Sequence, residues 1–442
     1  MSGSVFDSPL HAKLFPTGDM GRLFTDTAEV RAMMLVEGSL AKVQGALDII
    51  PELSAAAIHR ASLELQIDPA GLGAATGING VTVPGLVAEF RKLMQAPEHA
   101  QYLHFGATSQ DIADTALMLR VRQLLGLQDT ALRALLGDLA RLAHDHAETA
   151  MVARTYGQSA TLSSFGAMVA VWGNMLADLV DALPVLRDGV LWVSLSGAAG
   201  TGSVLGPDPD RVRADLAAAV GLRDPKRSWH ADRGPILRLA AWQTQVTAAL
   251  GKMAQDILIM TQSGLKTVSL DAKGGSSTMP QKENPVQPSA IVALANMAAG
   301  LNATLTQAAQ HREARDGAAW FTEWMSLPQL CLTAGSALIL SGTMIAGLAP
   351  NATALSTQIH NTDDMILAEA ITFVLAHKMP RPDAADRVKS MVKVALAQNT
   401  RLLEIVKSQH PDLDLAQFEP AKQLGSAPHF ARDFAARVSS FT

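Results

Sequence analysis

The sequence contains very little cysteine. Among its 442 residues Cys331 is the single cysteine, so the chain can form neither an intrachain disulfide nor a cysteine metal cluster. This usage fits a reducing compartment, and we predict a cytoplasmic protein in which Cys331 is a buried core thiol. Residues 1–15 also lack the basic start, the apolar stretch and the small-residue cleavage site of a signal peptide.

Charge is scarce as well. Only 17% of the residues are charged, and 36 Lys and Arg against 41 Asp and Glu give a formal net charge of −5. This balance offers no basic surface for nucleic acid or an anionic membrane, so we expect neither as a partner. An anionic ligand must therefore be held by a local basic cluster. The length exceeds the roughly 100–200 residues of one domain and predicts two or three domains.

Two long stretches, 284–311 and 324–362, contain no charged residue at all. Either is long enough to cross a bilayer, for which about 20 apolar residues suffice. Polar residues such as Asn296 and Ser341 interrupt them, however, and neighbouring helices can satisfy those groups whereas lipid cannot. We therefore predict buried helices of a bundle rather than membrane spans.

The apolar residues recur with helical spacing. Steps of three and four predict helices over 33–50, 239–260 and 327–348, and the last is apolar on much of its circumference. No sustained alternation typical of a strand is apparent. We predict an all-α fold of three helical domains around a long central helix bundle: an N-terminal domain over residues 1–110, the central bundle over 111–350 and a C-terminal domain over 351–442.

The loop 274–285, Gly-Gly-Ser-Ser-Thr-Met-Pro-Gln-Lys-Glu-Asn-Pro, is the most informative segment. Its composition fits a mobile functional loop and a plain linker equally well. As an ordered string it resembles the signature loop of the fumarase/aspartase superfamily, helical enzymes that add or eliminate a group beside a carboxylate. The resemblance implies that Ser276 exchanges the proton on the carbon next to that carboxylate, while Lys282 and Asn284 hold the charge of the carbanion. Two further loop residues are expected to contact the substrate: Ser277 and Met279.

A second string, His104-Phe-Gly-Ala-Thr-Ser-Gln-Asp, opens a helix. Thr108 or Ser109 can cap the first free amides, and a helix N-terminus with hydroxyl groups is also an anion site. The string resembles the carboxylate-binding element of the same superfamily. We expect Thr108, Ser109 and His104 to bind the substrate.

A third string, Ala153-Arg-Thr-Tyr-Gly-Gln-Ser-Ala, resembles a family element that often reads Arg-Thr-His-Gly-Gln. The match implies substrate contacts for Thr155 and Gln158, but Tyr156 stands in the place of the histidine. In the amine-releasing lyases of the family that histidine is usually implicated as the acid that protonates the leaving nitrogen. A carboxylate, with an ordinary pKa of about 4, needs no such acid.

The segment 310–328 resembles the cycloisomerase branch of the superfamily, in which a substrate carboxylate adds to a conjugated alkene and forms a lactone. His311, Arg312 and Arg315 form a basic cluster suited to a polyanionic substrate, although a network with Glu313 and Asp316 at a helix end is an alternative for Arg315.

These matches imply a cofactor-free cycloisomerase that closes 3-carboxy-cis,cis-muconate to 4-carboxymuconolactone in aromatic catabolism, and a homotetramer whose sites are shared between subunits. An adenylosuccinate-type amine lyase using His104 or His311 as its acid, a cycloisomerase of 3-sulfomuconate and a catalytically silent scaffold are the alternatives. The string His144-Asp145-His146 has no third ligand at metal spacing, so we expect no metal site.

Overall fold

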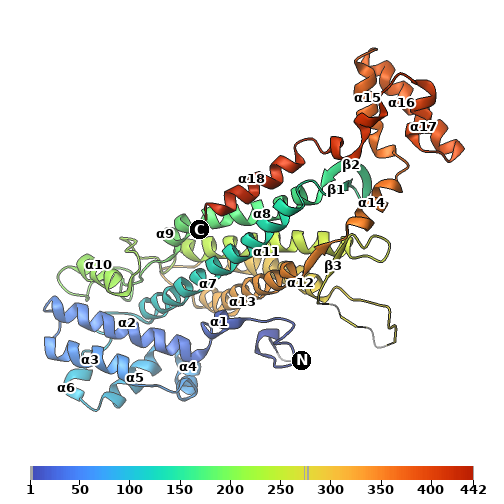
Figure 1. The fold of residues 1–442 in the computed structure, drawn as a ribbon. Helices are drawn as coiled ribbons and strands as arrows, with labels where there is room; N and C mark the ends of the chain where they lie inside the picture. The colour runs from blue at the N-terminus through green and yellow to red at the C-terminus, as the bar shows by residue number, and fades with distance from the viewer. Residues whose placement is uncertain (1–2, 273, 276–277, 442) are drawn as a thin grey trace. The chain divides into compact units, whose positions relative to one another are not determined.

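The computed structural model describes residues 3–272, 274–275 and 278–441 and consists mainly of helices (Figure 1), which confirms the all-α fold class. The chain divides into two compact units, each built from three segments. The first unit comprises Met1–Ala131, Leu179–Ala248 and Ala293–Ile339. The second comprises Leu132–Asp178, Ala249–Val292 and Leu340–Thr442. The three domains expected from the sequence remain a prediction.

The first unit begins with a layer of helices in which α2 and α3 pack closely. Gly38 and Gly45 lie on the face of α2 that meets α3: a Cβ at Gly38 would approach the Ser62 hydroxyl, and one at Gly45 the Ala55 methyl. Small residues thus allow the two helices to approach. Thr25 caps α2 by accepting from the Ala28 amide. The helices of this layer are α1 (Gly18–Arg22), α2 (Asp26–Ala46), α3 (Glu52–Glu64), α4 (Gly73–Asn79), α5 (Val83–Met94) and α6 (Pro97–Ala100).

Long helices carry most of the remaining chain. The predicted helix over 239–260 lies within α11, and the one over 327–348 overlaps α13, which begins ten residues earlier and ends two residues earlier than predicted. Cys331 on α13 is fully buried, as predicted, and burial raises the pKa of its thiol to about 12. The long helices and two shorter ones are α7 (Ser109–Asp145), α8 (Phe165–Asp181), α9 (Leu183–Val190), α10 (Pro209–Val220), α11 (Gly234–Met260), α12 (Val286–Ala308) and α13 (Gly317–Ala346).

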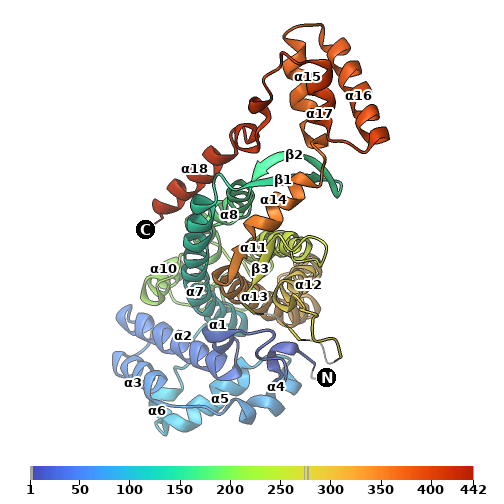
Figure 2. The same ribbon diagram turned by 45° about the vertical axis from the view of Figure 1, so that its right-hand side comes forward.

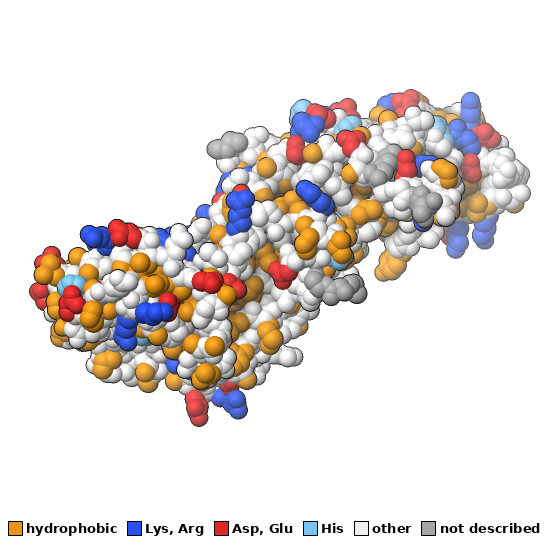
Figure 3. Space-filling view, turned by 90° about the horizontal axis from the view of Figure 1, so that it is seen from below, with side chains coloured by type: hydrophobic (Ala, Val, Ile, Leu, Met, Phe, Trp, Pro, Cys, Tyr) orange, Lys and Arg blue, Asp and Glu red, His pale blue; other side chains and the backbone are white. Residues whose placement is uncertain are grey.

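Two of these helices, α12 and α13, are long and apolar enough to cross a membrane by length and composition. In the most apolar window of α13, 67% of the residues are buried within the chain, against 28% for α12. On the face drawn in Figure 3, acidic and basic side chains are interspersed among apolar ones rather than gathered by sign.

The second unit holds short strands that the sequence did not reveal. Strand β1 (Ala150–Thr155) pairs with β2 (Gln158–Ser164), and β3 (Val268–Leu270) pairs with β4 (Leu348–Pro350), both antiparallel. In β2 mostly exposed polar residues surround the buried Leu162, so the apolar alternation of a strand is missing. Tyr156 and Gly157 both have positive φ, 52° and 74°, as a two-residue type I′ hairpin turn requires.

The C-terminal region of the second unit has its own core. Phe418, Leu402 and Met391 are fully or almost fully buried and belong to one apolar cluster with Val152 and Leu162 of the hairpin. Helices α15, α16 and α17 form a compact group in Figure 2. The helices here are α14 (Ala352–His360), α15 (Ala368–Ala376), α16 (Arg381–Gln398), α17 (Leu402–Gln409) and α18 (Ala427–Ser439).

Gly166 provides a test of the packing in this unit. A Cβ at this position would lie 2.3 Å from the Ala143 carbonyl oxygen and 2.8 Å from the Ala147 backbone, which cannot move as a side chain can. We expect Gly166→Ala to lower the free energy of unfolding by about 1–3 kcal/mol in urea denaturation. Gly137→Ala on α7, where a Cβ would meet no other described part of the chain within 4 Å, should instead stabilise by up to about 1 kcal/mol. Equal effects would contradict this packing.

Candidate active site

The N-terminus of α7 is tied to two distant segments by a buried carboxylate. Asp111 is fully buried and accepts hydrogen bonds from the backbone amides of Ser196 and Gly197 at 2.8 and 2.9 Å. It also accepts from His230 Nε2 at 2.8 Å and from the Thr108 amide at 3.0 Å. The glycine-rich turn around residue 200 is therefore held beside the start of the helix, in the first unit.

One turn further along α7, Asp114 is one of two carboxylates that compensate the charge of a buried arginine. Arg233 has no exposed side-chain surface and donates to both carboxylate oxygens of Asp114 and of Glu323. Burial alone would lower the pKa of Arg233, but the two carboxylates raise it well above its usual value. The guanidinium also lies 4.8 Å from the centre of the Trp229 ring. This cluster is charged yet internally satisfied, so it provides a rigid support rather than a binding site.

Arg315 has a different environment from the other arginines of this region. Its Nε donates to Gln110 Oε1 at 2.7 Å, and Nη2 lies 3.5 Å from Thr108 Oγ1 and 3.4 Å from the Ala198 carbonyl. All three acceptors are neutral, so the charge is available to an anion. It is Arg312, not Arg315, that donates to Asp316.

His104 is held by a buried carboxylate that the sequence pattern did not reveal. Its Nδ1 lies 2.7 Å from Oε1 of Glu37, which has no exposed side-chain surface. Burial would lower the pKa of His104, but the charge and hydrogen bond of Glu37, with the charge of Asp111, raise it despite the opposing charge of Arg91. Nδ1 therefore donates to the Glu37 carboxylate.

His311 is the opposite case. Burial, and then the charge of Arg233, lower its pKa, so the ring is neutral at pH 7. Its Nδ1 accepts from the Asp316 amide at 3.4 Å, and its buried Nε2 has no hydrogen-bond partner among the described residues. A neutral ring held in this way is poorly suited to act as an acid.

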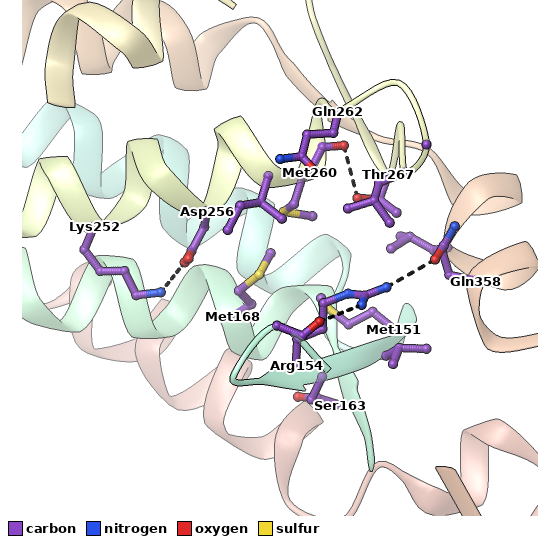
Figure 4. Close-up of a pocket in the computed structure, with 17 residues that line it drawn as sticks. Met151, Arg154, Ser163, Met168, Lys252, Asp256, Met260, Gln262, Thr267 and Gln358 are labelled. Carbon is purple, nitrogen blue, oxygen red and sulfur yellow. Dashed lines mark hydrogen bonds and ion pairs between the residues drawn. The ribbon is translucent and has the colours of Figure 1, made fainter. Parts of the chain in front are cut away.

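In the second unit, the β1–β2 hairpin carries Thr155 and Gln158 on either side of its turn, both exposed. Tyr156 at the turn is entirely exposed. Behind the hairpin lies a cavity of about 740 Å³ with largely apolar walls, drawn in Figure 4. There Arg154 donates to Gln358 Oε1 and Lys252 pairs with Asp256.

In the second unit, backbone hydrogen bonds join the two ends of the loop 274–285, called here the signature-like loop. The backbones of Gly274 and Asn284 exchange two hydrogen bonds, at 3.0 and 2.7 Å, and the Asn284 side chain donates to the Gly275 carbonyl. Lys282 and Asn284 line a cavity of about 550 Å³ together with Lys266 and Gln262. With Glu283 also at this cavity, the two lysines leave an excess of positive charge, which favours an anionic ligand.

Comparison with known proteins places the chain in a family. A family model described as Lyase matches residues 22–300. The chain belongs to this lyase family. It is 33% identical to the 3-carboxy-cis,cis-muconate cycloisomerase of Bradyrhizobium diazoefficiens over 95% of this chain and 96% of that protein. It is 31% identical to the nitrosuccinate lyase of Streptomyces davaonensis over 96% and 94%. The crystal structure of the 3-carboxy-cis,cis-muconate lactonizing enzyme from Pseudomonas putida superposes with a TM-score of 0.91 at 29% identity, covering 98% and 100%.

The fumarase/aspartase resemblance is thereby confirmed, and the chain is an enzyme of the lyase family. The roles assigned to single residues remain predictions. Within the first unit the structure brings Thr108 and Arg315 together and holds His104 near Asp111. The second unit carries the hairpin and the loop, where Ser276 and Ser277 lie outside the described residues. The other predicted site residues fall in both units. Those of the first unit are His104, Thr108, Ser109, His311, Arg312 and Arg315. Those of the second are Thr155, Gln158, Met279, Lys282 and Asn284.

Two residues that lie beside predicted site residues, Glu37 and Lys266, were not identified from the sequence. Glu37 begins a string, Glu-Gly-Ser-Leu-Ala, that resembles the superfamily, but nothing in this pattern indicates a buried carboxylate paired with a histidine 67 residues away. Lys266, beside the signature-like loop, lies between two elements and carries no motif. Its positive φ of 47° is visible only in the structure.

The Glu37–His104 pair predicts a pH-dependent stability. Because folding raises the pKa of His104, its contribution is fully present below the unfolded value of about 6.5 and is lost as the pH rises through the folded value. We expect Glu37→Gln to lower the free energy of unfolding by about 1–3 kcal/mol at about pH 6 and by less at higher pH. Glu64→Gln, at an exposed carboxylate, is the matched control. A deficit independent of pH would contradict the pairing.

Proposed function

We propose that this chain is a 3-carboxy-cis,cis-muconate cycloisomerase. In this reaction a carboxylate of the substrate adds to the conjugated alkene and forms a new carbon–oxygen bond, while the neighbouring carbon accepts a proton, giving 4-carboxymuconolactone. The names of the cycloisomerases from Bradyrhizobium and Pseudomonas, which the chain matches over almost its whole length, support this choice. No metal or cofactor is required by these steps, because the nucleophile is already ionised at neutral pH.

The proposal gives each region of the site a role. Ser276 delivers the proton, while Lys282 and Asn284 stabilise the doubly charged carboxylate of the intermediate. The remaining carboxylates meet Arg315 and the hydroxyls at the start of α7. The raised pKa of His104 beside Glu37 favours a further positive charge at this position. The other predicted contacts are Thr155, Gln158, Ser277, Met279, His311 and Arg312.

The observation that carries the proposal is the residue at the hairpin turn. Tyr156 occupies the position where related amine lyases have a histidine acid, and the pKa of His311 is lowered. A reaction that adds a carboxylate, or expels one in reverse, needs neither acid. Expulsion of nitrite from nitrosuccinate fits the same argument, because nitrite is also a weakly basic anion, and the 31% identical nitrosuccinate lyase makes it the second candidate.

We further propose a homotetramer with shared sites that acts on a small polyanionic carboxylate in the cytoplasm. Helix α12 supports the assembly. It contains no charged residue, yet only 28% of its most apolar window is buried within one chain. An apolar face of this length needs a protein partner in water, and copies of the same chain are the simplest source.

The test is a direct assay of the purified protein without added metal or nucleotide. Loss of the diene absorbance with 3-carboxy-cis,cis-muconate supports the cycloisomerase. The sulfonated muconate, nitrosuccinate and adenylosuccinate serve as parallel substrates. Turnover of nitrosuccinate alone would transfer the assignment to the second candidate. Turnover of adenylosuccinate alone would show that another residue, with His104 the first to examine, supplies the missing acid.

Ser276→Ala separates chemistry from assembly. We expect kcat for the muconate to fall by about 10²–10⁴, because a positioned proton donor is lost, while size-exclusion chromatography still shows the wild-type oligomer. The unfolding midpoint should stay within about a degree of the wild-type value, since a loop hydroxyl contributes little packing. An unchanged kcat would remove Ser276 from the mechanism.

A further inference from the structure

Gln110, the second residue of α7, has a fixed side-chain orientation. The residue is fully buried, and its amide nitrogen donates to Asp114 Oδ2 at 3.2 Å and to the His230 carbonyl at 3.0 Å. Both partners can only accept, so the NH₂ group must face them. The amide oxygen consequently points the other way, and there it accepts from Arg315 Nε at 2.7 Å.

The anchor behind Gln110 is itself rigid. Asp114 is held by both terminal nitrogens of the buried Arg233, at 2.7 and 3.1 Å, and Arg233 is held in turn by Glu323 on α13. A chain of buried hydrogen bonds therefore runs from the interior to the Nε of Arg315. Among the described residues, the Nη2 atom of Arg315 makes only long contacts of 3.4–3.5 Å, to Ala198 and Thr108.

We propose that Gln110 is a positioning residue: it fixes the guanidinium of Arg315 so that the terminal nitrogens bind a substrate carboxylate beside the Thr108 hydroxyl. The inference rests on the proposed function, in which Arg315 meets a carboxylate. Gln110 does not touch the substrate. It acts by restricting the rotamers of a long side chain before binding, which reduces the entropy lost on binding.

A neutral amide is the one side chain of this size that meets both demands. A glutamate here would face the Asp114 carboxylate with a like charge and would neutralise Arg315. A methionine has nearly the same length but accepts no strong hydrogen bond, so it releases Arg315 while filling the same space. Gln110→Met is therefore the informative substitution.

The experiment is a double-mutant cycle measured by steady-state kinetics with 3-carboxy-cis,cis-muconate. We expect Gln110→Met and Arg315→Ala each to raise KM about tenfold with a smaller change in kcat, and the double variant to resemble Arg315→Ala alone. Gln128→Met is the matched control. Gln128 is also fully buried on α7, where it exchanges two amide hydrogen bonds with Gln243, and its loss should affect stability but leave KM unchanged.

The outcomes separate this inference from the proposed function. If Gln110→Met raises KM equally with and without Arg315, or if Gln128→Met raises it as much, Gln110 is merely structural. If the wild type does not turn over the muconate, the proposed function fails, and the same cycle is read from tricarballylate binding by titration calorimetry. If Gln110→Met and Arg315→Ala then weaken tricarballylate binding equally and non-additively, the positioning role of Gln110 is supported. No binding to the wild type, or binding that Arg315→Ala leaves unchanged, overturns it.

Discussion

The buried carboxylate of Asp111 is the constraint on which the arrangement of the predicted site residues in the first unit depends. It is fully buried and accepts five hydrogen bonds, from the segment 194–197, from His230 and from the start of its own helix. Removing such a carboxylate would leave these donors unpaired, and each buried orphan costs about 1–3 kcal/mol. The glycine-rich turn, His230 and the opening of α7 are therefore fixed together before any ligand arrives.

The spacing along α7 explains how one helix serves both interior and site. Gln110 and Asp114 are four residues apart and lie on one face, while Asp111 is three residues before Asp114. The carboxylates of Asp111 and Asp114 bind His230 and Arg233, respectively, in the interior. The side-chain amide of Gln110 connects this buried cluster to Arg315. The preceding Thr108 lies at the helix N-terminus, where the macrodipole favours a negative charge. The supporting residues and the predicted substrate contacts thus lie within one short string, residues 108–114.

The sequence was sufficient for those features that depend on local pattern. Helical spacing located α11 and α13, and the ordered loop around Lys282 identified the superfamily. The sequence was insufficient to predict interactions between side chains that lie far apart along the chain. Arg312 and Arg315 lie three residues apart in one string, and only the fold pairs the first with Asp316 and leaves the second with neutral acceptors. The hairpin was missed because its turn, with Tyr156 at positive φ, breaks the usual preference for Asn or Gly.

The partners of each arginine, rather than the number of arginines, determine which of them is available to bind an anion in this weakly charged enzyme. Arg233 faces two carboxylates and Arg312 faces one, so neither has an uncompensated charge to offer. Arg315 meets only an amide oxygen, a hydroxyl and a carbonyl among the described residues. These neutral acceptors fix the direction of the guanidinium without reducing its charge, which is the condition for strong binding of a carboxylate. A net charge of −5 is therefore compatible with an anionic ligand, because the guanidinium of Arg315 is positioned without a carboxylate partner among the described residues.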